Sequence, residues 1–451
     1  MKACFSPLFT DLYELTMAAV YFEHEMFAPA TFSLFIRHYP PNRRFFLAAG
    51  LEHLLELLED FRFSEEDLAY LEGLKLFKPA FLDYLKGLRF TGEVFALPEG
   101  TIFFTNEPLI EITAPIIEAQ LVETLVINIL NFETLIATKA ARCLLAAQGK
   151  PVVDFSARRT QGIDASLRVA RASYLAGFAA TSNTLAGRLF DIPVTGTMAH
   201  SFIQSFGEEE EAFLAFAKMF PENTILLLDT YDSLAAVPKA IKVARYLEKE
   251  GKRLKGVRLD SGDLLTLSRE VRRRLDEAGL SYVKIFVSGG LDEYQIAKLC
   301  QAGAPIDAFG VGTKMGVSAD APYLDAAYKL VSYAGRPVAK FSQGKATLAG
   351  AKQVFRRRDE KGYFFEDWIG LREEPPPAGS VPLLERVMAS GKRTKAKESL
   401  EKIRKRAAAE LSSLPPHLKE LIPTADPYPV HLTQALSALQ EKVRQEFFSS
   451  K

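Results

Sequence analysis

The sequence is poor in cysteine, with only Cys4, Cys143 and Cys300 among its 451 residues. An odd number of widely spaced cysteines builds neither a disulfide framework nor a four-cysteine zinc site within one chain. The sequence also lacks an uninterrupted apolar run of about 18 residues, the length that a membrane-spanning helix needs. Its first residues contain no continuous apolar segment of the kind found in signal peptides. We therefore expect a cytoplasmic protein, in a reducing compartment, with no membrane partner.

Net charge is absent as well, because 56 Lys and Arg residues balance 56 Asp and Glu residues. No sequence-wide positive field exists to hold nucleic acid, so an anionic ligand must be bound by a local site. The chain has enough hydrophobic residues to form a large core, at 48% hydrophobic and 25% charged residues. That balance is typical of globular proteins, and the length predicts two or three domains, or one large barrel with additions.

The first 150 residues are expected to form an α+β domain. Residues 10–88 are mostly helical in pattern, with Leu51, Leu54, Leu55 and Leu58 at the spacing of a buried helical stripe. The turn-forming triplets PEG and NEP divide residues 90–115 into short predicted strands. Residues 116–148 contain neither Gly nor Pro, which predicts one long helix or two abutting helices.

Residues 151–325 repeat a pattern of a short apolar run, a polar or glycine-bearing turn and an amphipathic segment. The candidate strands are PVVDF, DIPVTG, TILLLD, GVRLD, VKIFVSG and IDAFGVG, and helices are expected at 165–177 and 264–278. Six parallel strands are compatible with a doubly wound sheet or with a barrel. In both architectures, functional residues gather where the strands end.

Residues 326–451 are expected to return to the first domain. The stretch YKLVSYAGRPVAKFS predicts a hairpin that turns at AGR, and YFFEDWIGL predicts a further strand. The basic stretch at 392–414 interleaves Glu and contains no aromatic residue, so it favours a solvated helix face over a nucleic-acid-binding patch.

Several candidate site residues follow the predicted strands. The stretch DFSARRTQGIDA at 154–165 offers Phe155 as a stacking face and adjacent arginines that can bind a carboxylate or a phosphate. An ion pair with a neighbouring Asp is the structural alternative. His200 follows another candidate strand, where a lone histidine is often structural. Asp229 closes the apolar run TILLLD.

Two further groups follow the later strands. Arg258, Asp260 and Asp263 lie within six residues and could bind one cation and one anion, although a surface charge cluster would look similar. The glycines in VSGGLDEY and FGVGTKMG expose backbone N–H groups that can cradle a phosphate; they are Gly289, Gly290, Gly310 and Gly312. The spacing of GVGTKMG does not match a dinucleotide-binding loop.

Eight motifs occur in one order along the chain: TDLYELTM, SLFIRHYP, DFSARRT, TMAHSF, LDTYDS, VRLDSGD, SGG and GVGT. In this order they resemble the nicotinate phosphoribosyltransferase family, of the type II phosphoribosyltransferase group that also holds the nicotinamide and quinolinate enzymes. The resemblance implies an α/β fold in which an N-terminal α+β domain is joined to an irregular, incomplete α/β barrel. It also implies a head-to-tail homodimer with shared active sites.

The reaction implied by the resemblance joins nicotinate to 5-phosphoribosyl 1-diphosphate. It gives nicotinate mononucleotide and diphosphate for NAD biosynthesis and salvage, with ATP hydrolysis coupled to the transfer. The implied cofactors are ATP and Mg²⁺, with Asp229 and Asp260 as acids near the ribose and the ion. His200 matches the histidine that ATP phosphorylates transiently.

The resemblance also implies the substrate contacts. Phe155 and Tyr13 of the partner subunit resemble the two faces that enclose the pyridine ring. Arg158 and Arg258 resemble the contacts of the ring carboxylate and the ribose phosphate, while Arg37 of the partner subunit resembles a diphosphate contact. The four glycines named above resemble the cradle of the 5′-phosphate.

Asn183 bears on the choice of substrate. In the nicotinamide enzymes an Asp in the corresponding stretch accepts a hydrogen bond from the amide, and the stretch TSNT places Asn183 there. An Asp would repel a carboxylate whereas Asn can donate to it, so the acid is favoured over the amide. The alternatives are a nicotinamide or quinolinate enzyme on the same fold, or a non-catalytic metabolite-binding relative. The quinolinate enzyme would be shorter and more cationic at its site, and the binding relative would lose some of the catalytic residues.

Overall fold

The computed structural model describes residues 5–342 and 345–449, so Cys4 lies outside the described residues. The chain divides into two compact units, one made of Met1–Thr138 and Tyr323–Lys451 and the other of Lys139–Pro322. The sequence places the corresponding divisions near residues 150 and 325. The first division lies earlier than expected because it falls inside helix α6 (Glu123–Ala147), whose apolar pattern continues across it.

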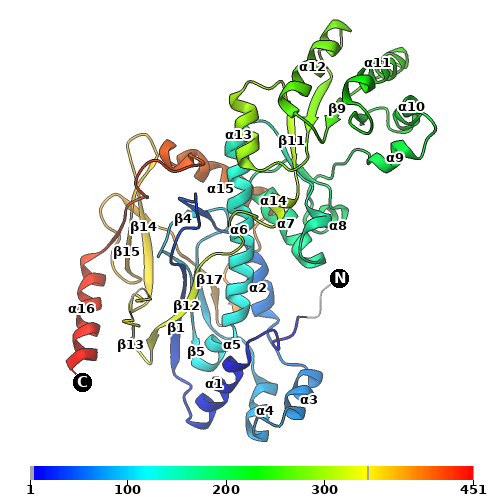
Figure 1. Ribbon diagram of the computed structural model, residues 1–451. Coiled ribbons are helices and arrows are strands. Elements are labelled where there is room, and N and C mark those ends of the chain that lie inside the picture. The colour runs from blue at the N-terminus through cyan, green and yellow to red at the C-terminus, as the bar shows by residue number, and fades with distance from the viewer. Residues whose placement is uncertain (1–4, 343–344, 450–451) are drawn as a thin grey trace. The chain divides into compact units, whose positions relative to one another are not determined.

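The first unit is built on a seven-stranded antiparallel sheet with the order β13-β12-β1-β5-β3-β17-β18 (Figure 1). Strands β12 and β13 form the predicted hairpin, and β12 pairs with β1, so the segment after residue 325 joins the sheet of the N-terminal segment. The strands are β1 (Pro29–Ile36), β3 (Glu93–Ala96), β5 (Pro108–Pro115), β12 (Ala326–Tyr333), β13 (Arg336–Pro337), β17 (Glu385–Ala389) and β18 (Lys392–Arg393).

Strand β1 corrects the expectation that residues 10–88 are mostly helical. It is buried from Ala30 to Ile36, in the middle of the sheet. A strand covered on both faces lacks the alternation of polar and apolar residues that marks a half-exposed strand. The helices of this segment are α1 (Leu12–Glu23), α2 (Leu51–Glu59), α3 (Glu65–Gly73) and α4 (Pro79–Gly87). Residues 116–148 form the two abutting helices, α5 (Ile116–Leu121) and α6.

The first unit also contains two smaller sheets. One has the order β16-β14-β15-β19, with β14 (Lys352–Arg358), β15 (Phe364–Leu371), β16 (Ser380–Pro382) and β19 (Val430–Leu432); the other pairs β2 (Phe46–Leu47) with β4 (Ile102–Phe103). Strand β15 is the strand predicted from YFFEDWIGL. Within 392–414 the structure forms α15 (Leu400–Ser413), where Lys402 and Arg406 pair with Glu398. The last helices are η2 (Pro416–Lys419) and α16 (Gln434–Ser449).

The second unit contains a six-stranded parallel sheet with the order β7-β6-β11-β10-β9-β8 (Figure 1). Its strands are β6 (Val152–Asp154), β7 (Ala180–Thr181), β8 (Ile225–Leu227), β9 (Gly256–Leu259), β10 (Lys284–Val287) and β11 (Ala308–Val311). Strands β7 and β8 are its edges and do not pair with each other, so the sheet stays open. The incomplete α/β barrel expected from the sequence is thereby confirmed.

One predicted strand, DIPVTG at 191–196, is wrong. The position next to β6 is taken by the two-residue strand β7, and the predicted segment reaches it only through a single bridge between Thr181 and Val194. Pro193 has no N–H to extend the pairing, although its carbonyl accepts from the backbone of Thr181 at 3.0 Å. A strand of two residues is too short to leave a periodic signal.

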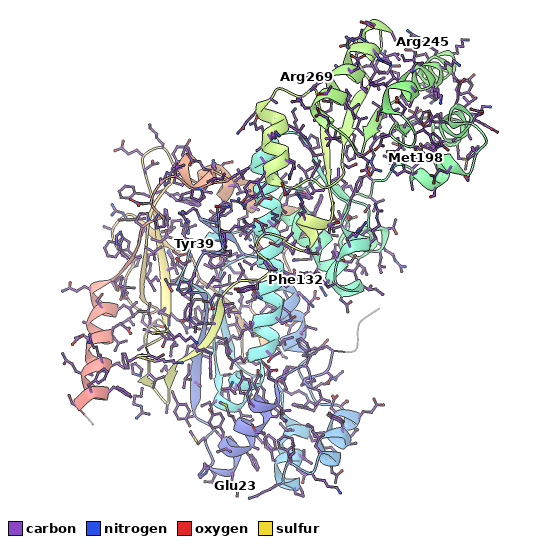
Figure 2. All side chains as sticks on the ribbon, in the orientation of Figure 1. Glu23, Tyr39, Phe132, Met198, Arg245 and Arg269 are labelled. Atoms are coloured by element: carbon purple, nitrogen blue, oxygen red, sulfur yellow. The ribbon has the colours of Figure 1, made fainter. Side chains whose placement is uncertain are left out.

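Helices follow the strands of the second unit. They are η1 (Ala157–Arg159), α7 (Ile163–Ala176), α8 (Thr184–Phe190), α9 (His200–Gln204), α10 (Glu209–Met219), α11 (Ser233–Lys249), α12 (Leu264–Glu277), α13 (Glu293–Gln301) and α14 (Thr313–Gly316). Arg245 on α11 donates to the carbonyl of Ala278, and Arg269 on α12 donates to the carbonyl of Ala302, which ties each helix to the end of the next (Figure 2). Among the described residues, no helix has the length and hydropathy needed to cross a bilayer.

Candidate functional site

The carboxyl ends of the parallel strands bring the predicted residues of the second unit to one edge of its sheet. Phe155 follows β6, Asp260 follows β9 and Ser288 follows β10. Because the strands run parallel, their carboxyl ends share one edge, and the loops that leave them can build a site together. Side-chain hydrogen bonds connect several of these loops.

Arg258 is the centre of a hydrogen-bonded cluster. Its guanidinium donates to Ser288 Oγ at 2.8 Å, to Thr197 Oγ1 at 3.0 Å and to Asp260 Oδ1 at 2.7 Å. Ser288 also donates to Asp260. Burial opposes the ionisation of Asp260, but the hydrogen bond from Ser288 and the charge of Arg258 outweigh it and lower the pKa of this carboxyl. The cluster is therefore an ionised acid and a fixed cation in direct contact.

Asp229 and His200 lie beside this cluster. The Oδ2 atom of Asp229 accepts from the backbone N–H of Asp260 at 3.2 Å and from the Ser261 hydroxyl. Its Oδ1 atom is buried and has no hydrogen-bond partner. His200 contacts Thr230 Oγ1 through Nδ1 at 3.1 Å and brings Nε2 to 4.0 Å from Asp260 Oδ2. The structure thus brings Asp229, Asp260 and His200 together, as the sequence predicts.

His200 stands at the start of helix α9, two residues after Met198, which is labelled in Figure 2. Its side chain is 42% exposed. A histidine that is half open to solvent and held through one ring nitrogen leaves its other nitrogen accessible to a reactant. No group of three or more His, Cys, Asp and Glu side chains suited to a metal ion occurs in the described ranges.

Phe155 occupies the same edge of the sheet and is shaped by glycine. Its ring lies 5.6 Å from that of Phe286 and 5.3 Å from the guanidinium carbon of Arg258. A Cβ at Gly310 would come within 2.9 Å of both phenyl rings, so only glycine leaves room for them. Gly310 therefore sets the place of the Phe155 ring.

Gly289, in the turn after β10, is required for a different reason. A Cβ on Gly289 would lie 1.7 Å from the carbonyl oxygen of Asp260, and its φ of +90° is strained for other residues. Gly290 also has a positive φ, whereas nothing lies near its missing Cβ. A Cβ at Gly312 would meet the carbonyl oxygen of Phe155 at 3.1 Å. These turns bring bare backbone close to the Arg258 cluster.

Arg158 and Asn183 line one cavity of about 490 Å³, formed by η1 and the first turns of α7 and α8. Asn183 caps α8, because its Oδ1 accepts from the backbone N–H of Ala186 at 3.1 Å. Its Nδ2 donates to Ser166 Oγ at 2.8 Å. The cavity also contains apolar side chains, among them Ile163 and Leu185, so it presents one cation and several polar groups beside an apolar wall.

Tyr13 and Arg37 belong to the first unit. Tyr13 is 46% exposed in the first turn of α1, and burial together with the charges of Glu123 and Glu14 raises the pKa of its hydroxyl. Arg37 follows β1 and pairs with Asp325 at 3.3 Å. These three acids all belong to the first unit.

Sequence reasoning missed several hydroxyl groups and one carboxylate at this edge. Thr197 and Ser288 hold the guanidinium of Arg258, yet neither residue type signals a site by itself. Asp154 is fully buried at the end of β6 and accepts hydrogen bonds from Ser156 and Thr181. An acid that ends a wholly apolar run is the one signal that could have identified Asp154.

Comparison with known proteins covers almost the whole chain. Three family models match: the nicotinate phosphoribosyltransferase N-terminal domain at residues 8–131, the nicotinate phosphoribosyltransferase family at 151–359 and the corresponding C-terminal domain at 377–440. A nicotinate phosphoribosyltransferase of Mycobacterium tuberculosis is 51% identical over 432 residues, which cover 95% of this chain and 92% of that protein.

Solved structures agree with the sequence matches. The crystal structure of human nicotinic acid phosphoribosyltransferase aligns with a TM-score of 0.87 and 32% identity, covering 96% of this chain and 99% of that one. The nicotinate-nucleotide pyrophosphorylase of Pyrococcus furiosus aligns with a TM-score of 0.73 and 28% identity, covering 90% and 94% of the two chains.

Proposed function

The chain belongs to the nicotinate phosphoribosyltransferase family, and from that premise we propose how its own residues carry out the transfer. The enzyme joins nicotinate to 5-phosphoribosyl 1-diphosphate in NAD biosynthesis and salvage. The observation that carries the residue assignment is the contact of Arg258, Asp260 and Ser288 beside the Phe155 ring. A flat aromatic face can stack on the pyridine ring, and a cation can bind a phosphate. An ionised acid can stabilise the positive charge of the reacting ribose.

Displacement of diphosphate builds positive charge on the anomeric carbon of the ribose and negative charge on the departing group. Asp260 is held ionised by Ser288 and Arg258, so it can stabilise the positive centre without a covalent bond. The same use of a carboxylate beside an oxocarbenium-like centre operates in glycoside cleavage. The backbone N–H groups of the turns that contain Gly289 and Gly310 are proposed to cradle the 5′-phosphate. The ring nitrogen of nicotinate is then the attacking nucleophile, and the protein need not supply one.

Asp229 and Asp260 fit a magnesium ion that binds together with the substrate. The buried Oδ1 of Asp229 has no partner in the structure, and carboxylate oxygens are the ligands that Mg²⁺ prefers. Mg²⁺ is usually held by one or two carboxylates and by substrate phosphates, which agrees with the small number of acids here. When bound, the ion would neutralise charge on the leaving diphosphate. Asp229 would then hold the ion, with Asp260 beside the ribose.

His200 serves the coupling of ATP hydrolysis in this proposal. Its Nδ1 is held by Thr230, so Nε2 is the free position for a transient phosphoryl group. Phosphorylation would add negative charge close to Asp260, 4.0 Å from Nε2, and would change the site that binds diphosphate.

The test is His200→Ala. This variant should keep ATP-independent transfer while losing both ATP stimulation and ATPase activity, and Thr230→Val, which loosens the ring without removing it, should lose them in part. Undiminished ATP stimulation in His200→Ala would overturn the assignment.

A homodimer with shared active sites is the proposed assembly. Phe9, Leu12 and Tyr13 are large apolar or aromatic side chains that lie exposed near the start of α1. In this arrangement Tyr13 of the partner subunit closes the pyridine site opposite Phe155, and Arg37 of the partner subunit contacts diphosphate.

Mixing inactive Tyr13→Ala and Arg258→Ala chains should yield heterodimers with one intact site and measurable activity. Heterodimers without any activity would contradict the sharing.

Arg158 and Asn183 are proposed to receive the nicotinate carboxylate, since they line one cavity. Arg158 supplies the charge and Asn183 an uncharged donor, which favours the acid over the amide. The enzyme is proposed to act in the cytoplasm, where its product enters NAD synthesis.

A further inference from the structure

Asp154 ends strand β6 and is the residue immediately before Phe155. Its side chain is fully buried, and none of the described cations pairs with it. Burial raises the pKa of this carboxyl, and hydrogen bonds from Ser156 and Thr181 work in the opposite direction. Burying a carboxyl without a cation costs free energy, which its hydrogen bonds must offset. The partners of these hydrogen bonds therefore show what Asp154 does for the site.

The hydrogen bonds of Asp154 reach two separate loops. Its Oδ1 accepts from the backbone N–H of Ser156 at 2.9 Å and from Ser156 Oγ at 2.6 Å. Its Oδ2 accepts from Thr181 Oγ1 at 2.7 Å. The same Thr181 oxygen accepts the backbone N–H of Asn183 at 3.0 Å. One carboxylate thereby joins the loop after β6, which carries Phe155, to the loop after β7, which carries Asn183.

The backbone makes the same connection once more. The carbonyl of Asp154 accepts the N–H of Ser182, in the loop after β7, at 2.9 Å. The N–H of Phe155 donates to the carbonyl of Val311 at 2.7 Å, which ties the Phe155 loop to strand β11. Gly316 packs closely against Ser156: a Cβ added to Gly316 would lie 2.4 Å from the Cβ of Ser156. The Asp154 side chain therefore fixes the spacing of two loops whose backbones have little room to shift.

We propose that Asp154 is a positioning residue for nicotinate, which holds the loop of Phe155 and Arg158 in register with Asn183 through Ser156 and Thr181. Asp154 touches no substrate in this scheme. The inference rests on the proposed placement of nicotinate against these two loops. Loss of the connection should weaken nicotinate binding and leave phosphoribosyl diphosphate, which is bound by other strand ends, unaffected.

The decisive variant is Thr181→Val, which keeps the side-chain shape and removes both hydrogen bonds of the hydroxyl. Its matched control is Thr224→Val. Thr224 is equally buried, but it precedes β8 at the opposite end of the sheet and donates only to the carbonyl of Phe220 at 2.7 Å. A second probe, Ser156→Ala, removes one bond and leaves the backbone bond to Asp154 in place.

Separate KM values for nicotinate and for phosphoribosyl diphosphate distinguish positioning from a general loss of structure. Thr181→Val should raise the KM for nicotinate about five- to tenfold, the lower end of the effect of losing two buried hydrogen bonds, and change the KM for phosphoribosyl diphosphate less than about twofold. Thr224→Val should change neither KM. Asp154→Asn, which retains an acceptor for Ser156, should bind nicotinate better than Asp154→Ala does.

A KM for nicotinate that stays at the wild-type value in both Thr181→Val and Ser156→Ala would overturn the inference, as would an equal change in the two KM values. Asn183→Asp, measured in parallel, separates two kinds of failure. If Asn183→Asp alters the preference for nicotinate while Thr181→Val does not, only the role of Asp154 fails. If neither variant has an effect, the proposed placement of nicotinate fails with it.

Discussion

Replacing Asn183 by Asp would place a negative charge in the cavity that also contains Arg158. The structure predicts that the fold tolerates this change. An Asp oxygen can accept the N–H of Ala186 and cap α8 as well as Asn183 does, and Ser166 can turn its hydroxyl to donate to the second oxygen. Any effect on catalysis should therefore come from the charge.

The size of the effect follows from the distance between like charges. Two unit charges about 5 Å apart in a partly buried site interact by about 1–4 kcal/mol. Asn183 is half-buried and shares its cavity with the Arg158 cation, so the lower half of that range applies. About 1–2 kcal/mol corresponds to roughly a 5- to 30-fold loss in nicotinate affinity. Nicotinamide can donate its amide hydrogens to the new carboxylate and should lose less, or gain.

The quantity to measure is the ratio of kcat/KM for nicotinate to kcat/KM for nicotinamide. Asn183→Asp should lower the ratio about tenfold, whereas Asn183→Ser, which keeps a capping oxygen without a charge, should change it much less. An unchanged ratio in a folded Asn183→Asp protein would refute the reasoning. The selection of the acid would then lie with Arg158 and its neighbours alone.

Three other variants test separate parts of the structure. Gly310→Ala adds a methyl group within 2.9 Å of the Phe155 ring, and such overpacking, which costs about 1–3 kcal/mol, should lower kcat/KM for nicotinate at least about fivefold; wild-type kinetics would contradict the packing. Burial raises the pKa of Glu14 to about 7 from 4.5, so the stability due to its proton is complete below pH 4.5 and is lost as the pH rises to about 7. In Glu14→Gln, melting temperatures should therefore vary less with pH over this window, and a wild-type pH profile would argue against a buried acid. Arg356→Met leaves the carboxylate of Asp367 buried without its cation and should cost about 3–5 kcal/mol in denaturant unfolding; a loss below about 1 kcal/mol would contradict the importance of the pair.

Much of the second unit could be predicted from sequence because its strands are apolar runs that end in polar residues. Strands β8 to β11 were found in this way, and their parallel order places Asp260 and the glycine turns at one edge. Strand β7 was missed because its two residues carry no period, and β1 was missed because burial on both faces removes the alternation. The break between α5 and α6 lies at Val122, without Gly or Pro to mark it.

The site was predictable where a residue type carries charge and less so where it carries only a hydroxyl. Asp260 stands out because a titratable residue rarely follows an apolar strand without a purpose. Arg258 stands out as a charged residue inside the apolar strand β9, and His200 was identified although the strand expected before it does not form. Thr197 and Ser288 act by holding Arg258, and only coordinates reveal such contacts. Asn183 caps a helix and also lines the cavity, and the sequence did not predict this double role. Its second hydrogen-bond partner, Ser166, lies on another helix.

We propose that this enzyme makes nicotinate mononucleotide and couples the transfer to ATP hydrolysis. One product assay tests it most directly: phosphoribosyl diphosphate is supplied with nicotinate, nicotinamide or quinolinate, each with and without ATP, and the mononucleotide, diphosphate and ADP are measured together. We predict that nicotinate gives by far the highest kcat/KM, that ATP stimulates the transfer and that ADP appears with the product. Faster turnover of nicotinamide or quinolinate, or transfer from nicotinate that is indifferent to ATP, would contradict the account.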